Sequence, residues 1–223
     1  DFLPQIFTPQ IINAALYKES LFRILIGLLK KLFIADYLGK YVDIVHELPA
    51  NFSGAENLLG MYAYSFQIYF DFSGYSDIAL GTAKLFGFEL LSNFRFPYFS
   101  RDIAEFWRRW HISLSSWFKD YLYIPLGGSR AGGRKAVRNT FIIFLVSGFW
   151  HGASWNFIVW GFIHACAFLP LLLLNRNRKN TDSVAQHTTL PTLKELGQMV
   201  STFGIVTFAW IFFRADTLQH ALG

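Results

Sequence analysis

The chain has 223 residues, of which 53% are hydrophobic and only 16% are charged, with a mean hydropathy of +0.31. A typical soluble domain is about 25% charged, so this composition argues against a soluble protein and favours one that sits in a membrane. The formal net charge of +5 would also suit a nucleic-acid-binding protein. We exclude nucleic acid as a partner, because the basic residues lie at the ends of apolar segments, where cytoplasmic anchors of membrane helices are expected.

Five regions are apolar enough to be considered as membrane segments, since a helix needs about 20 residues to cross the hydrocarbon core. The first is interrupted by Lys30 and Lys31, which indicate an interfacial end rather than a clean span. The second continues through two acidic residues toward residue 88. The five regions comprise residues 21–38, 58–72, 140–150, 155–174 and 199–213.

An amphipathic segment at residues 105–119 lies between the second and third apolar regions. Its aromatic and apolar side chains recur at helical spacing, which predicts one amphipathic helix with His111 on the apolar stripe. Such a helix would lie on the bilayer surface or pack on a bundle.

Basic residues cluster in residues 127–138, a predicted loop that includes Arg130, and again in residues 175–180. Positively charged loops tend to be cytoplasmic, so both clusters are placed on the same side of the membrane. Residues 140–174 must then go in and come back, because a single helix of that length would be about 52 Å long. We expect the break at residues 148–154, with His151 near the middle of the membrane beside a polar cavity.

The remaining features suggest a part of a longer protein. The chain begins at Asp1 and ends shortly after an apolar region, and it shows no repeat and no second soluble domain. Residues 1–223 are therefore expected to form a single domain that lacks N-terminal helices and the extreme C-terminus. Residues 175–191 are polar and predict a loop. The single cysteine, Cys166, is expected to be a small buried residue.

His151 is the first candidate functional residue, since an ionisable side chain at membrane depth is costly and marks a site by default. A neutral imidazole can act as a general base at pH 7. A histidine that bonds a backbone carbonyl at a helix break would look the same. His111 could stabilise developing negative charge or hydrogen-bond within a tryptophan-rich layer, and we expect His164 to be structural.

Other polar and aromatic residues are weaker candidates. Asp71 and Asp77 border an apolar run, where they could line a polar cavity or hydrogen-bond a kinked helix. Trp150 and Trp155 flank the predicted break, and tryptophans there could line a sugar-binding cavity or form an interfacial belt. No zinc-ligand spacing occurs, so no metal site is expected.

Several stretches resemble the membrane-bound O-acyltransferase family, and within it the alginate O-acetyltransferase type. The resemblance runs from about residue 7 to residue 213 and is carried by residues 69–77, 93–98, 101–116, 117–128 and 148–156. It implies an all-α fold, a multi-pass transmembrane helical bundle around a central funnel or tunnel, with re-entrant or amphipathic helices. It also implies the bacterial inner membrane as the location, with the family's two histidines corresponding to His151 and His111.

The resemblance further implies acyl transfer of an acetyl group from a cytoplasmic donor, taken to be acetyl-CoA, with no bound cofactor. His151 would accept the proton of an acceptor hydroxyl, and His111, Asn156 or free N–H groups at the helix break would stabilise the oxyanion. The expected partners are the lipid bilayer, a polysaccharide acceptor and a periplasmic acetyltransferase.

Alternative functions remain open at this point. Within the same family, the acceptor could be peptidoglycan, or the reaction could be D-alanylation of teichoic acid. Residues 123–128 resemble the acetylating branch more than the D-alanyl branch. A non-enzymatic polysaccharide export channel is the alternative of a different class.

Overall fold

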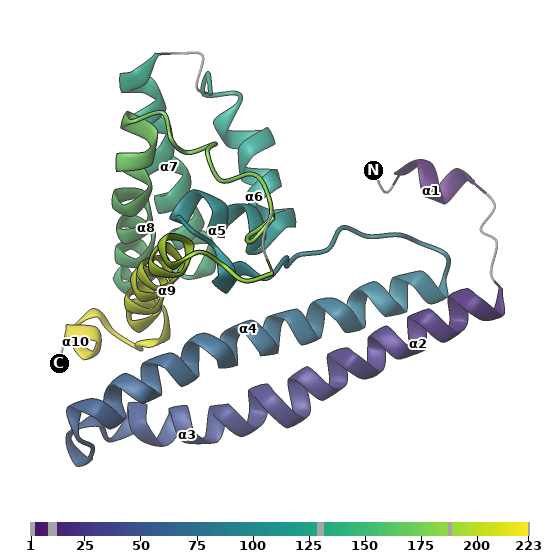
Figure 1. Ribbon diagram of the computed structural model, residues 1–223, viewed down its shortest axis with the longest axis horizontal. Helices are drawn as coiled ribbons and strands as arrows, with labels where there is room; N and C mark the ends of the chain where they lie inside the picture. The colour runs from purple at the N-terminus through teal and green to yellow at the C-terminus, as the bar shows by residue number, and fades with distance from the viewer. Residues whose placement is uncertain (1–2, 9–12, 129–131, 187–188, 223) are drawn as a thin grey trace. The chain divides into compact units, whose positions relative to one another are not determined.

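The computed structural model describes residues 3–8, 13–128, 132–186 and 189–222, and every regular element in them is helical. This confirms the predicted all-α class. The chain divides into two compact units, residues 1–93 and residues 94–223 (Figure 1). Each unit is described by itself below. The expectation of a single domain stays a prediction.

The first unit is a long helical hairpin preceded by a short helix, α1 (Leu3–Phe7). Its first arm runs continuously through α2 (Ala14–Leu28), the π-helical stretch η1 (Leu29–Ala35) and α3 (Asp36–Glu47). After the turn η2 (Pro49–Asn51), the second arm, α4 (Gly54–Leu85), packs along the first (Figure 1). Ser53 and Glu56 form a capping box that fixes the start of α4.

The two arms of this hairpin are joined by close backbone contact and by ion pairs. Gly27 and Gly74 oppose each other so closely that a Cβ on either would meet the backbone oxygen of the other. The Lys30 Nζ atom lies 2.6 Å from an Asp77 carboxylate oxygen, and Lys31 Nζ lies 2.5 Å from one of Asp71. The lysines that interrupt the first apolar region therefore face acidic residues of α4.

The second unit contains the amphipathic segment and the helices that follow it. In the described part of this unit, four short elements come first in the chain, three long helices follow, and one short helix comes last. The elements are η3 (Pro97–Phe99), α5 (Ile103–Arg109), α6 (Ile112–Phe118), η4 (Lys119–Tyr123), α7 (Gly133–His151), α8 (Trp155–Leu173), α9 (Leu193–Arg214) and α10 (Leu218–Leu222).

Helices α7 and α8 form a hairpin whose turn confirms the predicted break. Helix α7 ends at His151, Gly152 follows it with φ of 171°, and α8 starts at Trp155. The predicted loop at residues 127–138 is wrong from Gly133 onward, because α7 already begins there and its first turns carry basic residues. Arg130, assigned to the same loop, lies outside the described residues. The depth of His151 in a membrane stays a prediction.

Two helices, α8 and α9, are long and apolar enough to cross a membrane by length and composition. The other three predicted apolar regions are helical as well, but they do not meet that criterion. The expectation of a buried Cys166 is wrong, since its side chain is exposed on α8. An apolar run supplies residues to the outer face of a membrane helix as readily as to its packed face.

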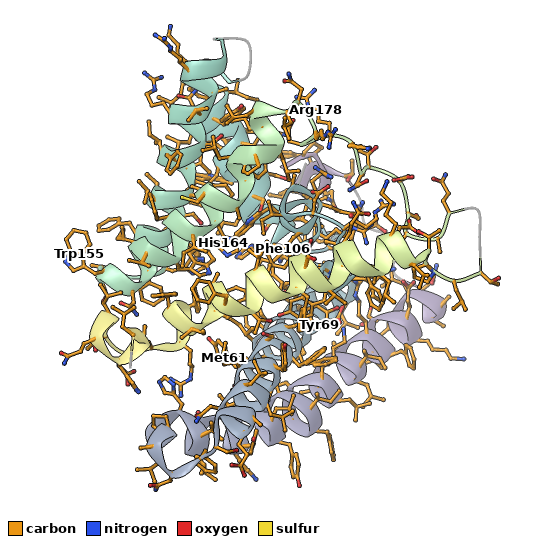
Figure 2. The ribbon with its side chains drawn as sticks, turned by 60° about the vertical axis from the view of Figure 1, so that its left-hand side comes forward. Met61, Tyr69, Phe106, Trp155, His164 and Arg178 are labelled. Atoms are coloured by element: carbon orange, nitrogen blue, oxygen red, sulfur yellow. The ribbon has the colours of Figure 1, made fainter. Side chains whose placement is uncertain are left out.

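The core of the second unit lies where α5, α8 and α9 meet. Phe106, Trp160, His164 and Trp210 are at most 2% exposed. His164 stacks between Phe106 and Phe144, with ring centroids 6.3 Å and 6.2 Å away. Figure 2 shows His164 and Phe106 together at this core. The enclosure of His164 by aromatic rings agrees with a structural position.

Candidate active site

His151 ends α7 half-buried among aromatic rings from three helices. Its imidazole centroid lies 4.9 Å from that of Trp150, 5.2 Å from Trp160 of α8 and 5.1 Å from Phe213 of α9, each in an edge-on arrangement. The turn at Gly152 ends α7, so the following backbone does not cover His151 with another helical turn. The side chain is thus held by aromatic packing at the end of a helix, and its role as a general base stays a prediction.

His111 does not lie on a continuous helix, so the prediction of one amphipathic helix over residues 105–119 is wrong. Helix α5 ends at Arg109, α6 begins at Ile112, and His111 between them has a left-handed backbone with φ of 46°. The cause is Trp110, which takes an extended conformation and is 4% exposed. Its ring packs 5.2 Å from that of Trp210, so burial of Trp110 outweighs the helical periodicity of the segment.

The structure brings the two predicted histidines to the same tryptophan. The His111 ring centroid lies 6.4 Å from that of Trp150, whose other neighbour is the His151 ring. Burial lowers the pKa of His111 to about 4. The His111 imidazole is therefore neutral at pH 7, and a neutral imidazole carries one N–H donor.

Asn156 has structural partners at both ends of its side-chain amide. Its Nδ2 atom donates to the Ala215 carbonyl oxygen at 2.6 Å, and its Oδ1 accepts from the Ser154 hydroxyl. The side chain is 2% exposed and ties the start of α8 to the end of α9. These contacts suit a residue that positions the helices, and the oxyanion role of Asn156 stays a prediction.

The remaining predicted residues are spread over both units. Trp155 is 74% exposed at the start of α8 (Figure 2), and Trp150 is 58% exposed. Asp71 and Asp77 belong to the first unit, where both form ion pairs with lysines of η1. These pairs favour the structural alternative for the two acidic residues, and their assignment to a cavity stays a prediction, as does the expectation of no metal.

A cavity of about 500 Å³ lies within the second unit, on the face of α7 that also carries His151. Four residues of α7 line it at helical spacing, and residues of α5, α6, η4 and α8 close it. The lining comprises Trp107, Leu114, Ser115, Phe118, Lys119, Tyr123, Thr140, Ile143, Phe144, Ser147, Phe168, Leu172, Asn175, Asn177 and Arg178.

Neither His111 nor His151 lines the cavity, but its lining includes a residue one helical turn from each of them, and it has a polar end at the surface. Ser147 is one helical turn before His151, and Ser115 donates its backbone N–H to the His111 carbonyl oxygen. Lys119, Asn175 and Arg178 are exposed at the other end. Figure 2 shows Arg178 and Trp155 at opposite ends of α8.

Sequence reasoning missed the lining of this cavity. The signal was present in α7, where Thr140, Phe144, Ser147 and His151 recur at intervals of three and four residues. This stripe predicts a shared face. The contributions of α6 and η4 could not be predicted, because they depend on the unforeseen bend at His111.

Comparison with known proteins assigns the chain to a family. Residues 6–213 match the model of MBOAT, the membrane-bound O-acyltransferase family. The match covers most of the chain, so the chain belongs to this family, as its resemblance predicted.

Named relatives fall into an acetylating and a D-alanylating group. A peptidoglycan O-acetyltransferase of Helicobacter pylori is 43% identical over 91% of this chain and 37% of its own length. A probable alginate O-acetylase of Pseudomonas aeruginosa is 43% identical over 92% of this chain and 37% of its own length. A teichoic acid D-alanyltransferase of Bacillus subtilis is 31% identical over 93% of this chain and 53% of its own length. The chain thus spans about two-fifths of the length of the acetylating relatives.

Proposed function

We propose that this chain carries the histidine site of a membrane O-acyltransferase that moves an acetyl group from a cytoplasmic donor to hydroxyls of a bacterial exopolysaccharide. The observation that carries the proposal is that His151 and His111 both pack against Trp150, next to a cavity lined by a residue one helical turn from each of them. In the whole protein we place this site in a multi-pass bundle around a tunnel through the inner membrane.

The chemistry of this proposal assigns a separate task to each histidine. His151 takes the proton of the acceptor hydroxyl while the hydroxyl oxygen attacks the acyl carbonyl carbon. The carbonyl oxygen gains negative charge, and the N–H of neutral His111 stabilises it. The carbonyl re-forms as the bond to the donor's sulfur breaks, and protonated His151 returns its proton to the leaving thiolate. The acetyl ester and the free thiol are the products.

The polar end of the cavity supports a cytoplasmic, anionic donor, for which we propose acetyl-CoA. The exposed Lys119 and Arg178 lie at this end, and the basic first turns of α7 carry Arg134 and Arg138. Positive residues at membrane-helix ends favour the cytoplasmic side. The phosphate groups of acetyl-CoA would meet positive charge at this end of the cavity. The rest of the donor would meet apolar walls deeper inside.

Relatives support acetylation of a bacterial glycan over transfer of D-alanine. Two relatives named for acetylation are each 43% identical to this chain, whereas the D-alanyltransferase of Bacillus subtilis is 31% identical. Peptidoglycan is the second candidate acceptor, because the relative named for it is as similar as the one named for alginate. We further propose a periplasmic acetyltransferase as the partner that completes transfer to the polymer.

The test of this function is His151→Gln in cells that produce the polymer. We expect acetyl ester in the secreted polymer, measured by proton NMR, to fall about 10²- to 10⁴-fold at unchanged polymer yield, because the general base is lost. His220→Gln, at an exposed histidine of α10, is the matched control. Unchanged acetylation with altered polymer yield would instead support the export channel.

A further inference from the structure

Residues 175–182, the first part of the segment between α8 and α9, contain no helix but are attached to α5 by hydrogen bonds. We call this part the α8–α9 loop. The Arg108 Nη1 atom donates to the Asn177 carbonyl oxygen at 2.8 Å, and its Nη2 donates to that of Asn180 at 2.7 Å. The Asn180 Nδ2 atom donates to a carboxylate oxygen of Asp102 at 2.6 Å. The loop backbone is therefore held at several successive points.

Arg101 anchors the far end of the same loop. Its Nη2 atom donates to the Asp182 carbonyl oxygen at 2.9 Å and to the Asp182 carboxylate at 2.8 Å. Arg101 also pairs with Glu105, whose side chain is 2% exposed. Loss of Arg101 would leave that buried carboxylate with one basic partner fewer, so an Arg101 variant would test folding rather than the loop. Arg108 is exposed and can be changed without leaving a buried charge.

The α8–α9 loop also forms part of the polar end of the cavity. Asn175, Asn177 and Arg178 line it there, opposite Lys119 and Tyr123 of η4. The carbonyl that Arg108 binds belongs to Asn177, which is itself a lining residue. The width of the cavity entrance therefore depends on where α5 holds the loop.

We propose that Arg108 is a positioning residue for the acyl donor, which it serves by holding the α8–α9 loop as one wall of the donor entrance. This inference rests on the proposed function. Arg108 does not touch the reacting atoms, so its loss changes how tightly the donor binds and leaves the transfer step intact. A planar guanidinium donates to two separate carbonyls at once, which a lysine ammonium at the same position cannot reproduce.

The experiment measures acetyl transfer from acetyl-CoA in membranes that contain the protein, with Arg108→Ala and Arg108→Lys beside wild type. We expect Arg108→Ala to raise KM for acetyl-CoA about tenfold with kcat within about twofold, since two hydrogen bonds that order the entrance are lost. Arg108→Lys should fall between the two. Arg95→Ala is the charge-matched control, because Arg95 is exposed, lies outside the cavity lining and has no side-chain hydrogen bond or ion pair among the described residues.

A second measurement does not depend on activity. The α8–α9 loop contains the trypsin sites Arg176, Arg178 and Lys179, so Arg108→Ala should speed cleavage there without changing cleavage at Lys135 of α7. A KM for acetyl-CoA in Arg108→Ala that equals the KM of the Arg95→Ala control, or full rescue by Arg108→Lys, would overturn the proposal. If the wild-type protein transfers no acetyl group from acetyl-CoA, the part of the proposed function that names acetyl-CoA as the donor is contradicted. Unaltered cleavage of the loop in Arg108→Ala would separately overturn the role of Arg108.

Discussion

His111 combines a candidate functional side chain with a left-handed backbone at φ of 46°. That conformation costs a residue with a Cβ about 1–2 kcal/mol, and glycine adopts it freely. We expect His111→Gly to be more stable than His111→Ala by about 1 kcal/mol, measured by thermal unfolding in detergent. Both variants should lose acetyl transfer, because both lack the imidazole N–H. Equal stability would contradict the strained backbone, and activity in either variant would contradict the role of the side chain.

Individual residues also show how far sequence reasoning reaches at this scale. The cost of an imidazole in an apolar stretch made His151 a candidate, the apolar stripe of residues 105–119 made His111 a second one, and the family resemblance gave both their predicted roles. Their shared contact with Trp150 was not predictable, because it depends on the bend beside Trp110. No glycine or proline in the sequence indicates that bend. It arises because the indole ring of Trp110 is buried in the core of the second unit.

At the scale of elements, α7 and α8 depend on two glycines that allow the helix backbones to touch. A Cβ at Gly148 would collide with the carbonyl oxygen of Phe157, and a Cβ at Gly161 would collide with that of Phe144. Both obstacles are backbone atoms, so the helices would have to separate. We expect Gly161→Ala to lower the free energy of unfolding by about 1–3 kcal/mol and to reduce acetyl transfer, since Phe144 lines the cavity.

Gly204→Ala on α9 is the matched control for this change. Nothing lies within 4 Å of a Cβ at Gly204, so alanine there should leave stability unchanged or raise it by up to about 1 kcal/mol. Thermal unfolding of the three proteins in one detergent makes the comparison. Similar losses at both positions would show that alanine disturbs these helices in general and that close α7–α8 contact is not the cause.

Elements differed in how well they could be predicted. The α7–α8 turn followed from the length limit of a membrane helix, and Gly152 lies in the predicted break. The π-helical turn η1 could not be predicted, because its two lysines pair with Asp71 and Asp77, which lie 40 and 47 residues later in the chain. The residues next to the two lysines in the sequence do not indicate which distant carboxylates will pair with them.

At the scale of the whole molecule, the α7–α8 hairpin brings the start of α7 and the end of α8 to the same end of the helix pair. The basic start of α7 and the basic residues after α8 lie at the end opposite the turn at residues 152–154. With the hairpin in the membrane, as we propose, the polar end of the cavity and both basic clusters lie on the cytoplasmic side. The acceptor would then reach the histidines from the other side, so donor and acceptor need not pass each other.

Cysteine labelling tests this topology. With Cys166→Ser as background, we expect a cysteine at Ala153 to react with a membrane-impermeant maleimide in intact spheroplasts. Cysteines at Lys135 and Lys179 should react only after the membrane is opened, because both residues are exposed at the basic end of the hairpin. Labelling of Lys135→Cys and Lys179→Cys from opposite sides would contradict a hairpin that returns to the same side. Labelling of both from outside would invert the orientation and place the entrance beside Arg178 on the periplasmic side, where acetyl-CoA could not reach it.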